Sequence, residues 1–431
     1  MATLADGVYA LLAATVGPFW WVRRRWKGKR SPPLGARLGR FEPPPPHDGP
    51  TAWFHAVSVG EALAARDLVR RVAEARRDAR IVVTCTTAAG LDVARRAYPD
   101  ATVLPSPLDF SFAVRRFLDA LRPTLLTLVE LELWPNLLAA CGARGVPVLV
   151  ANARVSERSF GRYRALLRVL PRFLDPVTTF LARGPEHAAR LRALGAPEGR
   201  VEVAGDLKFD NAEPAEPGAL RRRLRAEVGW ADDDPVLVAG STHPGEERAV
   251  VEAMRRVRRL FPRCRLVLAP RHLERTREVT ALLSSLQFAA VRRSDGASAS
   301  EAPCLLLDTT GELARWYAAG DVAFVGGSLA PIGGHNLLEP AVYGVPMITG
   351  PHLATVRDTA RLFAEAGALV EVKDAEALAD RVAERFASPD AARRGGAAAR
   401  SVIAERRGAA ARCAEAVLRE LDRRAPRGRS A

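Results

Sequence analysis

The sequence is poor in cysteine, lysine and aromatic residues. Its five cysteines are scattered and form no Cys-x-x-Cys pair, which argues against a disulfide framework and a structural zinc site and fits a reducing compartment. Aromatic residues make up only 6% of the chain, so aliphatic side chains and alanine must fill the core. With 48% apolar and 26% charged residues, neither a disordered chain nor a polytopic membrane protein is expected.

Several motifs of common enzyme classes are also missing. The chain has no GxSxG, no GxxxxGK[ST] and no GxGxxG, which excludes a hydrolase nucleophile elbow, a P-loop and a Rossmann nicotinamide site. Its histidines lack metal-ligand spacing and no Asp-x-Asp follows a predicted strand, so we expect neither a metal nor another cofactor.

Positive charge is concentrated at the two ends of the chain. The net charge is +15, of which residues 1–30 contribute +5 and residues 393–431 contribute +7, leaving +3 for the middle. A nucleic-acid enzyme would carry its basic stripe through the body, so we expect no nucleic-acid partner.

The N-terminal segment, residues 1–30, has features of a membrane-associated helix. An uncharged stretch, Gly7–Val22, ends in tryptophans and a basic cluster, as at the cytoplasmic interface of a bilayer. It is shorter than the roughly 20 residues of a full span, which favours a helix lying on the surface. No cleaved signal peptide is expected, and an ordinary amphipathic helix packed on the body remains an alternative.

Short apolar runs alternate with helical patterns in two stretches, which predicts parallel βαβ units. The predicted fold is α/β, with two doubly wound Rossmann-like domains facing across a cleft, where ligands bind beyond the carboxyl ends of the strands. The predicted strands are 51–57, 80–84, 102–104, 125–128 and 147–151, then 235–239, 265–269, 304–307, 322–325 and 346–348. The predicted divisions are an N-terminal segment 1–30, domains 31–212 and 213–395, and a basic C-terminal helix and tail 396–431.

The second half carries candidate anion-binding residues after its predicted strands. A glycine-rich segment, Val325–Pro340, opens a helix and can bring backbone N–H groups close to a phosphate, with Gly327 and Ser328 as candidate contacts. Glu339 can accept hydroxyl groups of a ribose-like ring. Ser241 is a further candidate phosphate contact, and Arg271 can pair with a phosphate or carboxylate.

Acidic residues follow strands in the first half. Glu61 either removes a proton from a sugar hydroxyl or merely complements the start of a helix, and local sequence leaves both open. Glu130 and Glu132 are expected to share a strand face directly after an apolar strand, where unpaired acids are costly, which favours a functional role. Lys208, the single lysine between positions 30 and 372, is either a stabiliser of leaving-group charge or the partner of a nearby aspartate.

With these motifs the chain resembles the 3-deoxy-D-manno-octulosonic acid (Kdo) transferase family of lipopolysaccharide biosynthesis. Asp206 stands where that family often has asparagine, and it adds negative charge near Lys208. The segments that carry the resemblance run in family order: Ala56–Glu61, Glu130–Asn136, Asn152–Ser159, Gly205–Asp210, Gly240–Glu247, Pro270–Arg271, Asp308–Leu313 and Gly326–Ala341.

The resemblance implies a GT-B-type glycosyltransferase that moves Kdo from CMP-Kdo to a lipid A precursor, with inversion, without a metal and with release of CMP. It implies that Glu61 is the general base and that Glu130 and Lys208 stabilise the transition state. It further implies an enzyme at the cytoplasmic face of the inner membrane, in contact with its anionic surface. The residues it assigns to CMP are Pro270, Arg271, Gly311, Glu312, Leu313, Asn336, Leu337, Leu338 and Glu339.

Two alternatives remain at this point. One is another GT-B-type enzyme that uses a UDP-sugar, as a glycosyltransferase or an epimerase, since it would share the same fold. The other is a basic, membrane-associated protein without enzymatic activity. The segments Ser58–Glu61 and Glu130–Pro135 favour Kdo transfer over the first, and the nearly neutral middle of the chain argues against the second.

Overall fold

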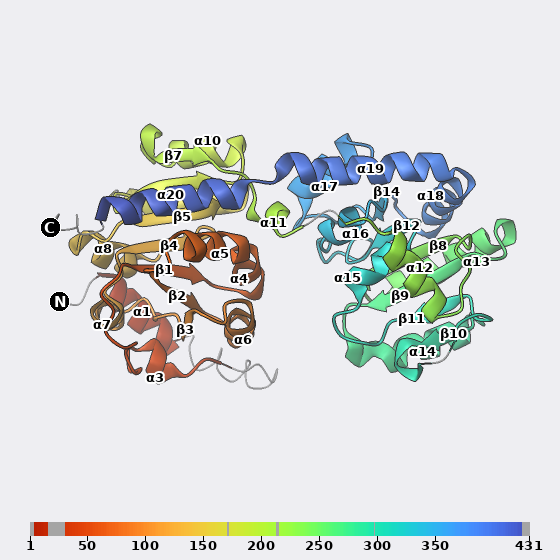
Figure 1. Ribbon diagram of the computed structural model, residues 1–431, viewed down its shortest axis with the longest axis horizontal. Coiled ribbons are helices and arrows are strands. Elements are labelled where there is room, and N and C mark those ends of the chain that lie inside the picture. The colour runs from red at the N-terminus through yellow and green to blue at the C-terminus, as the bar shows by residue number, and fades with distance from the viewer. Residues whose placement is uncertain (1–3, 16–30, 170–171, 213–214, 297, 425–431) are drawn as a thin grey trace. The chain divides into compact units, whose positions relative to one another are not determined.

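The computed structural model describes residues 4–15, 31–169, 172–212, 215–296 and 298–424, which form two compact units (Figure 1). Unit 1 comprises residues 1–211 and 406–431, and unit 2 comprises residues 212–405. The C-terminal segment predicted as a separate element is divided between them, because α20 (Ala409–Arg424) belongs to unit 1.

Unit 1 is built on a parallel seven-stranded sheet with the strand order β3-β2-β1-β4-β5-β6-β7. The strands are β1 (Thr51–Ala56), β2 (Arg80–Cys85), β3 (Thr102–Pro105), β4 (Leu125–Val129), β5 (Val148–Ala153), β6 (Val177–Ala182) and β7 (Val201–Val203). The helices are α1 (Leu4–Thr15), α3 (Leu34–Arg37), α4 (Val59–Ala64), α5 (Arg66–Ala75), α6 (Ala88–Ala97), α7 (Ser111–Leu121), α8 (Pro135–Ala143), α9 (Glu157–Val169), α10 (Pro185–Ala193), α11 (Leu207–Asp210) and α20.

Unit 2 repeats this plan with the strand order β10-β11-β9-β8-β12-β13-β14. The strands are β8 (Val236–Thr242), β9 (Arg265–Pro270), β10 (Ala290–Arg292), β11 (Cys304–Leu306), β12 (Val322–Val325), β13 (Met347–Thr349) and β14 (Leu369–Glu371). The helices are α12 (Gly218–Glu227), α13 (Glu246–Leu260), α14 (Thr276–Ser285), α15 (Leu313–Trp316), α16 (Leu338–Val342), α17 (Arg357–Glu365), α18 (Ala375–Ala387) and α19 (Pro389–Arg406).

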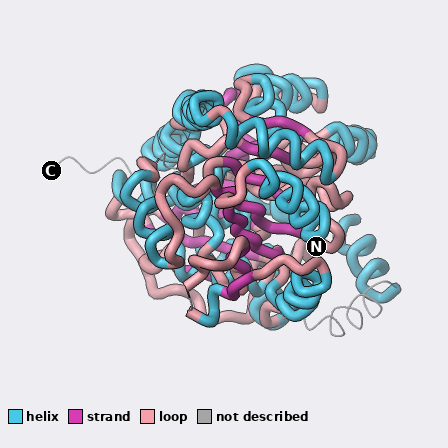
Figure 2. The backbone as a smooth tube through the Cα atoms, turned by 90° about the vertical axis from the view of Figure 1, so that its right-hand side faces the viewer, coloured by secondary structure: helices cyan, strands magenta, loops and turns pink. Residues whose placement is uncertain are grey.

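Alternation along the strands explains why each sheet is covered on both faces. In β1, Phe54 packs into one apolar cluster with α5 and α20, whereas Trp53 packs into the opposite cluster with α7 and α8. In β8, Leu237 and Val238 point to opposite clusters in the same way. Figure 2 shows the resulting arrangement, with strands flanked by helices. The predicted α/β fold with two doubly wound Rossmann-like sheets is therefore confirmed.

The sequence prediction missed β6, β7, β10 and β14. Three of these are only three residues long and lie at or next to a sheet edge, so they show almost no periodicity. The fourth, β6, carries a β-branched signal in Val177-Thr178-Thr179 that the prediction did not use.

The N-terminal helix α1 is attached to unit 1 through polar side chains. Tyr9 donates a hydrogen bond to Asp109 (3.0 Å), and Asp6 accepts one from the backbone N–H of Ser111 (2.7 Å). The tryptophans and the basic cluster of the predicted membrane segment lie outside the described residues. Among the helices described, none combines the length and the apolar character needed to cross a bilayer.

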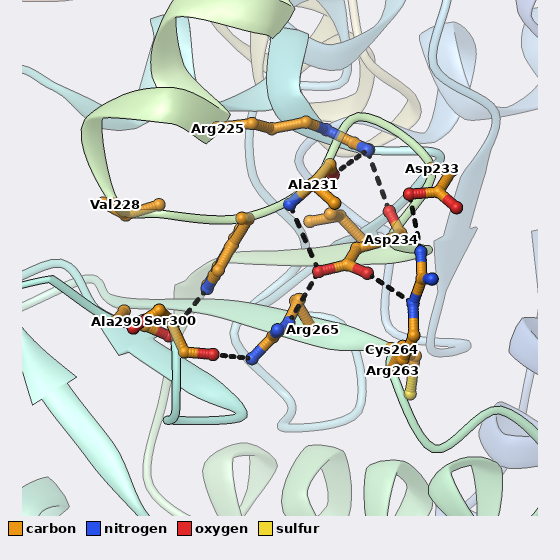
Figure 3. A network of polar contacts seen from close by, with 12 residues as sticks. Arg225, Val228, Ala231, Asp233, Asp234, Arg263, Cys264, Arg265, Ala299 and Ser300 are labelled. Atoms are coloured by element: carbon orange, nitrogen blue, oxygen red, sulfur yellow. Dashed lines mark hydrogen bonds and ion pairs between the residues drawn. The ribbon is translucent and has the colours of Figure 1, made fainter.

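At the amino edge of the sheet of unit 2, buried charges form a hydrogen-bonded network (Figure 3). Asp234, 2% exposed, accepts from Arg263 (2.9 Å) and Arg265 (3.0 Å). Arg225, fully buried, donates to the backbone carbonyls of Ala319 and Asp234 and pairs with Asp321. Each buried charge is thus compensated, which burial of an ion requires.

We predict that Asp234→Ala destabilises unit 2 by about 3 kcal/mol, because the change leaves the half-buried Arg265 without its carboxylate. Asp233→Ala is the matched control, since Asp233 pairs with Arg263 from a 74% exposed position, and it should destabilise the protein much less. Thermal unfolding of purified variants measures both effects. Equal losses in the two variants would contradict a special role for the buried carboxylate.

Candidate active site

In both units the candidate residues follow the carboxyl ends of parallel strands, which meet at one edge of a sheet. In unit 1, Glu61 follows β1, Glu130 follows β4 and Lys208 follows β7. In unit 2, Ser241 is the second-last residue of β8, Arg271 follows β9, and the glycine-rich segment follows β12.

Three residues at these edges have the left-handed backbone conformation that non-glycine residues rarely adopt. They are Glu130 (φ 62°), Asn152 (φ 56°) and Ser241 (φ 56°). The other two described cases, Arg122 and Gln287, lie just after helices, where this conformation is common. Strained backbone concentrated at one edge of each sheet supports the location of the candidate site.

Glu61 lies in the first turn of α4 and is held by a reciprocal cap. Its carboxylate accepts from the backbone N–H of Val57 (2.6 Å) and from the hydroxyl of Ser58 (2.9 Å), and the Ser58 oxygen in turn accepts from the N–H of Glu61. Burial raises the pKa of Glu61, the nearby charge of Glu130 raises it further, and the two hydrogen bonds oppose the change. Both interpretations left open by the sequence are thus compatible with the structure: Glu61 caps the helix, and its pKa shift suits a base.

The prediction that Glu130 and Glu132 share a strand face is wrong. β4 ends at Val129, and the left-handed conformation of Glu130 turns the chain out of the sheet, although its N–H still bonds to the carbonyl of Ala151 (2.9 Å). Tyr163 of α9 holds the following residues by donating to the carbonyl of Leu131 (2.7 Å).

The carboxylates of Glu61, Glu130 and Glu132 interact electrostatically in unit 1. Burial, reinforced by the charges of Glu61 and Glu130, raises the pKa of Glu132 to about 7. A group of acids that repel one another in a half-buried setting can hold a proton near neutral pH. The sequence motif drew attention to Glu132 but gave it no role.

Lys208 reaches the same part of unit 1 through α11. Asn152 accepts from the N–H of Leu207 (3.1 Å) at the start of this helix, and Asn211 at its end donates to the carbonyl of Ala64 (2.8 Å) in α4, the helix of Glu61. The chain therefore returns from β7 at the sheet edge to α4 near its centre.

The side chain of Lys208 is exposed, and neither nearby aspartate neutralises it. Asp206 pairs with Arg183, and Asp210 accepts from the N–H groups of Gly408 (2.6 Å) and Ala410 (3.0 Å) at the start of α20. No ion pair of Lys208 is found within the described part of the chain. The alternative role for Lys208, a salt bridge with Asp206 or Asp210, is thus not observed, and the cation is available for a ligand.

In unit 2, Arg271 follows β9 and Glu339 lies in α16 after β12, and the two side chains interact electrostatically. Pro270 ends β9, and the exposed Arg271 donates its N–H to the carbonyl of Thr242 (2.9 Å). Burial raises the pKa of Glu339, while the hydrogen bond from Asn336 (3.1 Å) and the charge of Arg271 oppose the rise. A half-buried carboxylate beside a cation can accept hydrogen bonds from the hydroxyl groups of a sugar.

Leu337 and Leu338 are 1% and 8% exposed, so their side chains belong to the core and only their backbone could meet a ligand. In the preceding loop, Gly311 has φ +81°, which an L side chain would resist. The carboxylate of Glu312 accepts a hydrogen bond from Thr309 and pairs with Arg293 and Arg315. These contacts outweigh the effect of burial and lower the pKa of Glu312.

The structure contradicts the expected phosphate contacts at Gly327 and Ser328. Their backbone N–H groups donate to the carboxylate of Glu246 at 2.7 and 2.9 Å. Ser328 is fully buried, and its hydroxyl donates to the carbonyl of Val325 (2.6 Å). An internal carboxylate thus takes the position expected for the ligand. Ser241 differs, because it is half-buried in a bulge of β8.

Two histidines link the loops after β8 and β12. The Nε2 atoms of His243 and His335 are 2.8 Å apart, and the rings stack in parallel with centroids 5.1 Å apart. Burial lowers the pKa of both, that of His335 to about 4, so the pair is neutral at pH 7 and one ring donates to the other. Within the described residues, no three His, Cys, Asp or Glu side chains are arranged to hold a metal ion.

Sequence reasoning missed Glu246 and Asp109. Glu246 lay inside a recognised motif, and the available signal was an acid that follows a tight turn and opens a helix. Asp109 accepts from the N–H groups of Asn136 (3.0 Å) and Leu137 (2.8 Å), and so holds the start of α8 directly after the acidic segment. No local pattern in the sequence could have suggested this cap, because 27 positions separate Asp109 from Asn136.

Comparison with known proteins agrees with this architecture. A family profile described as 3-deoxy-D-manno-octulosonic-acid transferase (kdotransferase) matches residues 33–211. The chain is 36% identical over 438 residues to a 3-deoxy-D-manno-octulosonic acid transferase of Bordetella pertussis, covering 96% of this chain and 99% of that protein. It is 34% identical over 388 residues to the enzyme of that name from Haemophilus influenzae, covering 89% and 90%.

A glycosyltransferase from Rickettsia africae shares the fold, with a TM-score of 0.58 and 12% identity over 88% of this chain and 99% of that one. Two Rossmann-like units of this kind define a GT-B-type protein. The chain belongs to the Kdo transferase family. It is a glycosyltransferase of lipopolysaccharide biosynthesis.

The raised pKa of Glu132 predicts a pH-dependent stability. The folded protein holds this proton up to about pH 7, whereas the unfolded chain releases it near the ordinary value of 4.5. Stability from this group is therefore present below pH 4.5 and lost as the pH rises through 7.

We expect Glu132→Gln to unfold at a higher temperature than the wild type above pH 7 and to lose this advantage toward pH 4.5. The measurement is the unfolding temperature from pH 4.5 to 8, with Glu157→Gln, an 84% exposed site on α9, as the control. Parallel curves for Glu132→Gln and the wild type would rule out the shifted proton.

Proposed function

We propose that the protein transfers Kdo from CMP-Kdo to a lipid A precursor with inversion at the anomeric carbon and release of CMP. The observation that carries this proposal is Glu61, a carboxylate with a raised pKa beside Glu130 in a chain that matches Kdo transferases over nearly its full length. A carboxylate of this kind can take the proton of an acceptor hydroxyl.

In this mechanism the acceptor oxygen attacks the anomeric carbon as its proton passes to Glu61, and the bond between that carbon and the CMP phosphate oxygen breaks. Positive charge develops on the sugar, and the carboxylate of Glu130 stabilises it. Negative charge develops on the departing phosphate, and Lys208 stabilises it as a cation with no partner among the described side chains.

Unit 2 supplies the donor-binding groups in this proposal. Arg271 is an exposed cation that can pair with a phosphate or the sugar carboxylate. Glu339 can accept the ribose hydroxyls, and Asn336 orients it. Pro270, the turn at Gly311–Leu313 and the backbone of Leu337 and Leu338 complete the proposed CMP contacts. No metal is needed in this scheme, because the cationic side chains meet the donor charge.

We expect Glu61→Gln to lower kcat about 100- to 10,000-fold, because glutamine retains hydrogen-bonding groups for the helix cap but cannot accept the proton. The assay follows Kdo addition to a defined lipid A precursor by mass spectrometry of the product. Glu74→Gln is the control, since Glu74 is a 61% exposed residue of α5 that pairs only with Arg70 among the described residues. Undiminished transfer by Glu61→Gln would exclude Glu61 as the base.

We also propose that the enzyme works at the cytoplasmic face of the inner membrane, where an anionic surface attracts the basic N-terminal segment. A lipid acceptor and a nucleotide-activated donor are both available there. The hydrogen bonds of α1 to Asp109 and Ser111 support this, because they join the N-terminal segment to the unit that carries Glu61.

Replacing Arg23, Arg24 and Arg25 by serine should weaken binding to anionic vesicles about 100-fold, at about 1 kcal/mol for each charge. Flotation with vesicles that contain phosphatidylglycerol measures this, and vesicles of phosphatidylcholine alone show the background. Unchanged flotation of the triple variant would place the membrane contact elsewhere in the chain.

A further inference from the structure

The carboxylate of Glu246, the first residue of α13, lies buried in a ring of backbone N–H groups. Glu246 is 1% exposed. One of its oxygens accepts from the N–H of His243 (2.9 Å) and that of Gly327 (2.7 Å). The other accepts from the three N–H groups of Ser328, Leu329 and Ala330, at 2.9, 2.8 and 3.1 Å.

This carboxylate has no cationic partner in the described part of the chain. Burying an ionised group is unfavourable unless hydrogen bonds compensate it, and here backbone dipoles do so. Successive N–H groups around a left-handed residue form a concave anion-binding site, and Gly327 supplies that residue with φ +67°. The turn therefore holds an anion of its own before any phosphate is present.

The turn that Glu246 holds also fixes the second glycine pair. The carbonyl of Gly327 accepts from the N–H groups of Gly333 (3.0 Å) and Gly334 (2.7 Å). The hydroxyl of Thr355 binds the carbonyls of the same pair at 2.6 and 2.8 Å. The chain then runs directly into His335 and the proposed donor-binding residues Asn336–Glu339.

Glu246 reaches His335 by a second route, through His243. The N–H of His243 donates to the carboxylate, and its ring bonds to the ring of His335. Position 326, between Glu246 and the carbonyl of Ser241, requires glycine. A Cβ there would clash, because it would lie 2.8 Å from the Glu246 carboxylate and 2.6 Å from the carbonyl oxygen of Ser241. One carboxylate thus joins the loops after β8 and β12.

We propose that Glu246 is a positioning residue for donor binding: its carboxylate substitutes for an anionic ligand in the turn Gly327–Ala330 and so holds His335 and Asn336–Glu339 in place for the nucleotide. The inference rests on the proposed function, because the proposed function assigns residues Asn336–Glu339, which follow the turn, to CMP binding. It also means that the donor phosphate binds other groups, with Arg271 as the available cation.

Hydrogen–deuterium exchange on the wild-type enzyme tests, without a mutation, whether Glu246 occupies the turn Gly327–Ala330 in place of a ligand. The amides of residues 327–330 should exchange slowly in the free enzyme, and CMP should add protection at 336–339 but none at 327–330. Fast exchange at 327–330 that CMP slows would overturn the proposal, because those amides would then be the phosphate site.

Glu246→Gln tests whether this carboxylate supports the binding of CMP-Kdo. The NH2 group of the glutamine would face backbone N–H groups and could not accept their hydrogen bonds. We expect the KM for CMP-Kdo and the Kd for CMP, measured by calorimetry, to rise at least tenfold while kcat falls less than threefold. A purely structural role would reduce the folded fraction without changing KM, so an unchanged KM overturns the proposal. Glu252→Gln on the exposed face of the same helix, where Glu252 pairs with Arg248, is the control and should match the wild type.

If Glu246→Gln does not fold, Glu246→Asp provides the same test, because it keeps the charge but shortens its reach. Its KM should also rise, and an unchanged KM would again overturn the proposal. Failure of the proposed function is recognised separately: the wild type would then not transfer Kdo from CMP-Kdo, whereas the exchange of residues 327–330 in the free enzyme still reports on Glu246.

Discussion

The parallel sheet is the constraint on which the rest of each unit depends. Parallel strands require long crossovers, and the crossovers place helices on both faces and all carboxyl ends at one edge. In unit 1 this brings Glu61 and Glu130 together from the adjacent strands β1 and β4, although they are 69 positions apart in the chain. In unit 2 it collects the ends of β8, β9 and β12 in the same way.

Buried and half-buried carboxylates organise these edges. Glu61 and Asp109 each cap a helix start in unit 1, Asp210 receives the start of α20, and Glu246 fills the glycine turn of unit 2. Each uses the unpaired N–H groups of a turn or helix start, which must be satisfied by some acceptor. Because internal acceptors meet this need, the loops are ordered independently of a ligand, and binding then requires less loss of conformational entropy.

The sequence predicted the central strands of both sheets, the doubly wound α/β fold and the edges where the candidate residues lie, because these depend on apolar runs and on parallel connectivity. It did not predict contacts between distant segments. The partner of Asp206 is Arg183, 23 residues away, and the anion in the turn at Gly327 comes from Glu246, 81 residues away. No local pattern encodes such pairs, which arise only when loops from different strands meet. The left-handed turn at Glu130 was equally hidden, since alternation alone would have continued the strand.

The position of α20 has a consequence for how the chain acquires its structure. Unit 2 is inserted into unit 1, whose apolar cluster is completed by Cys413, Val417 and Leu421 from the last helix. During synthesis the ribosome therefore releases unit 2 as a complete folding unit while unit 1 still lacks one of its covering helices. The surface of α5 that receives α20 stays open until α20 has been made, so unit 1 is begun before unit 2 but completed after it.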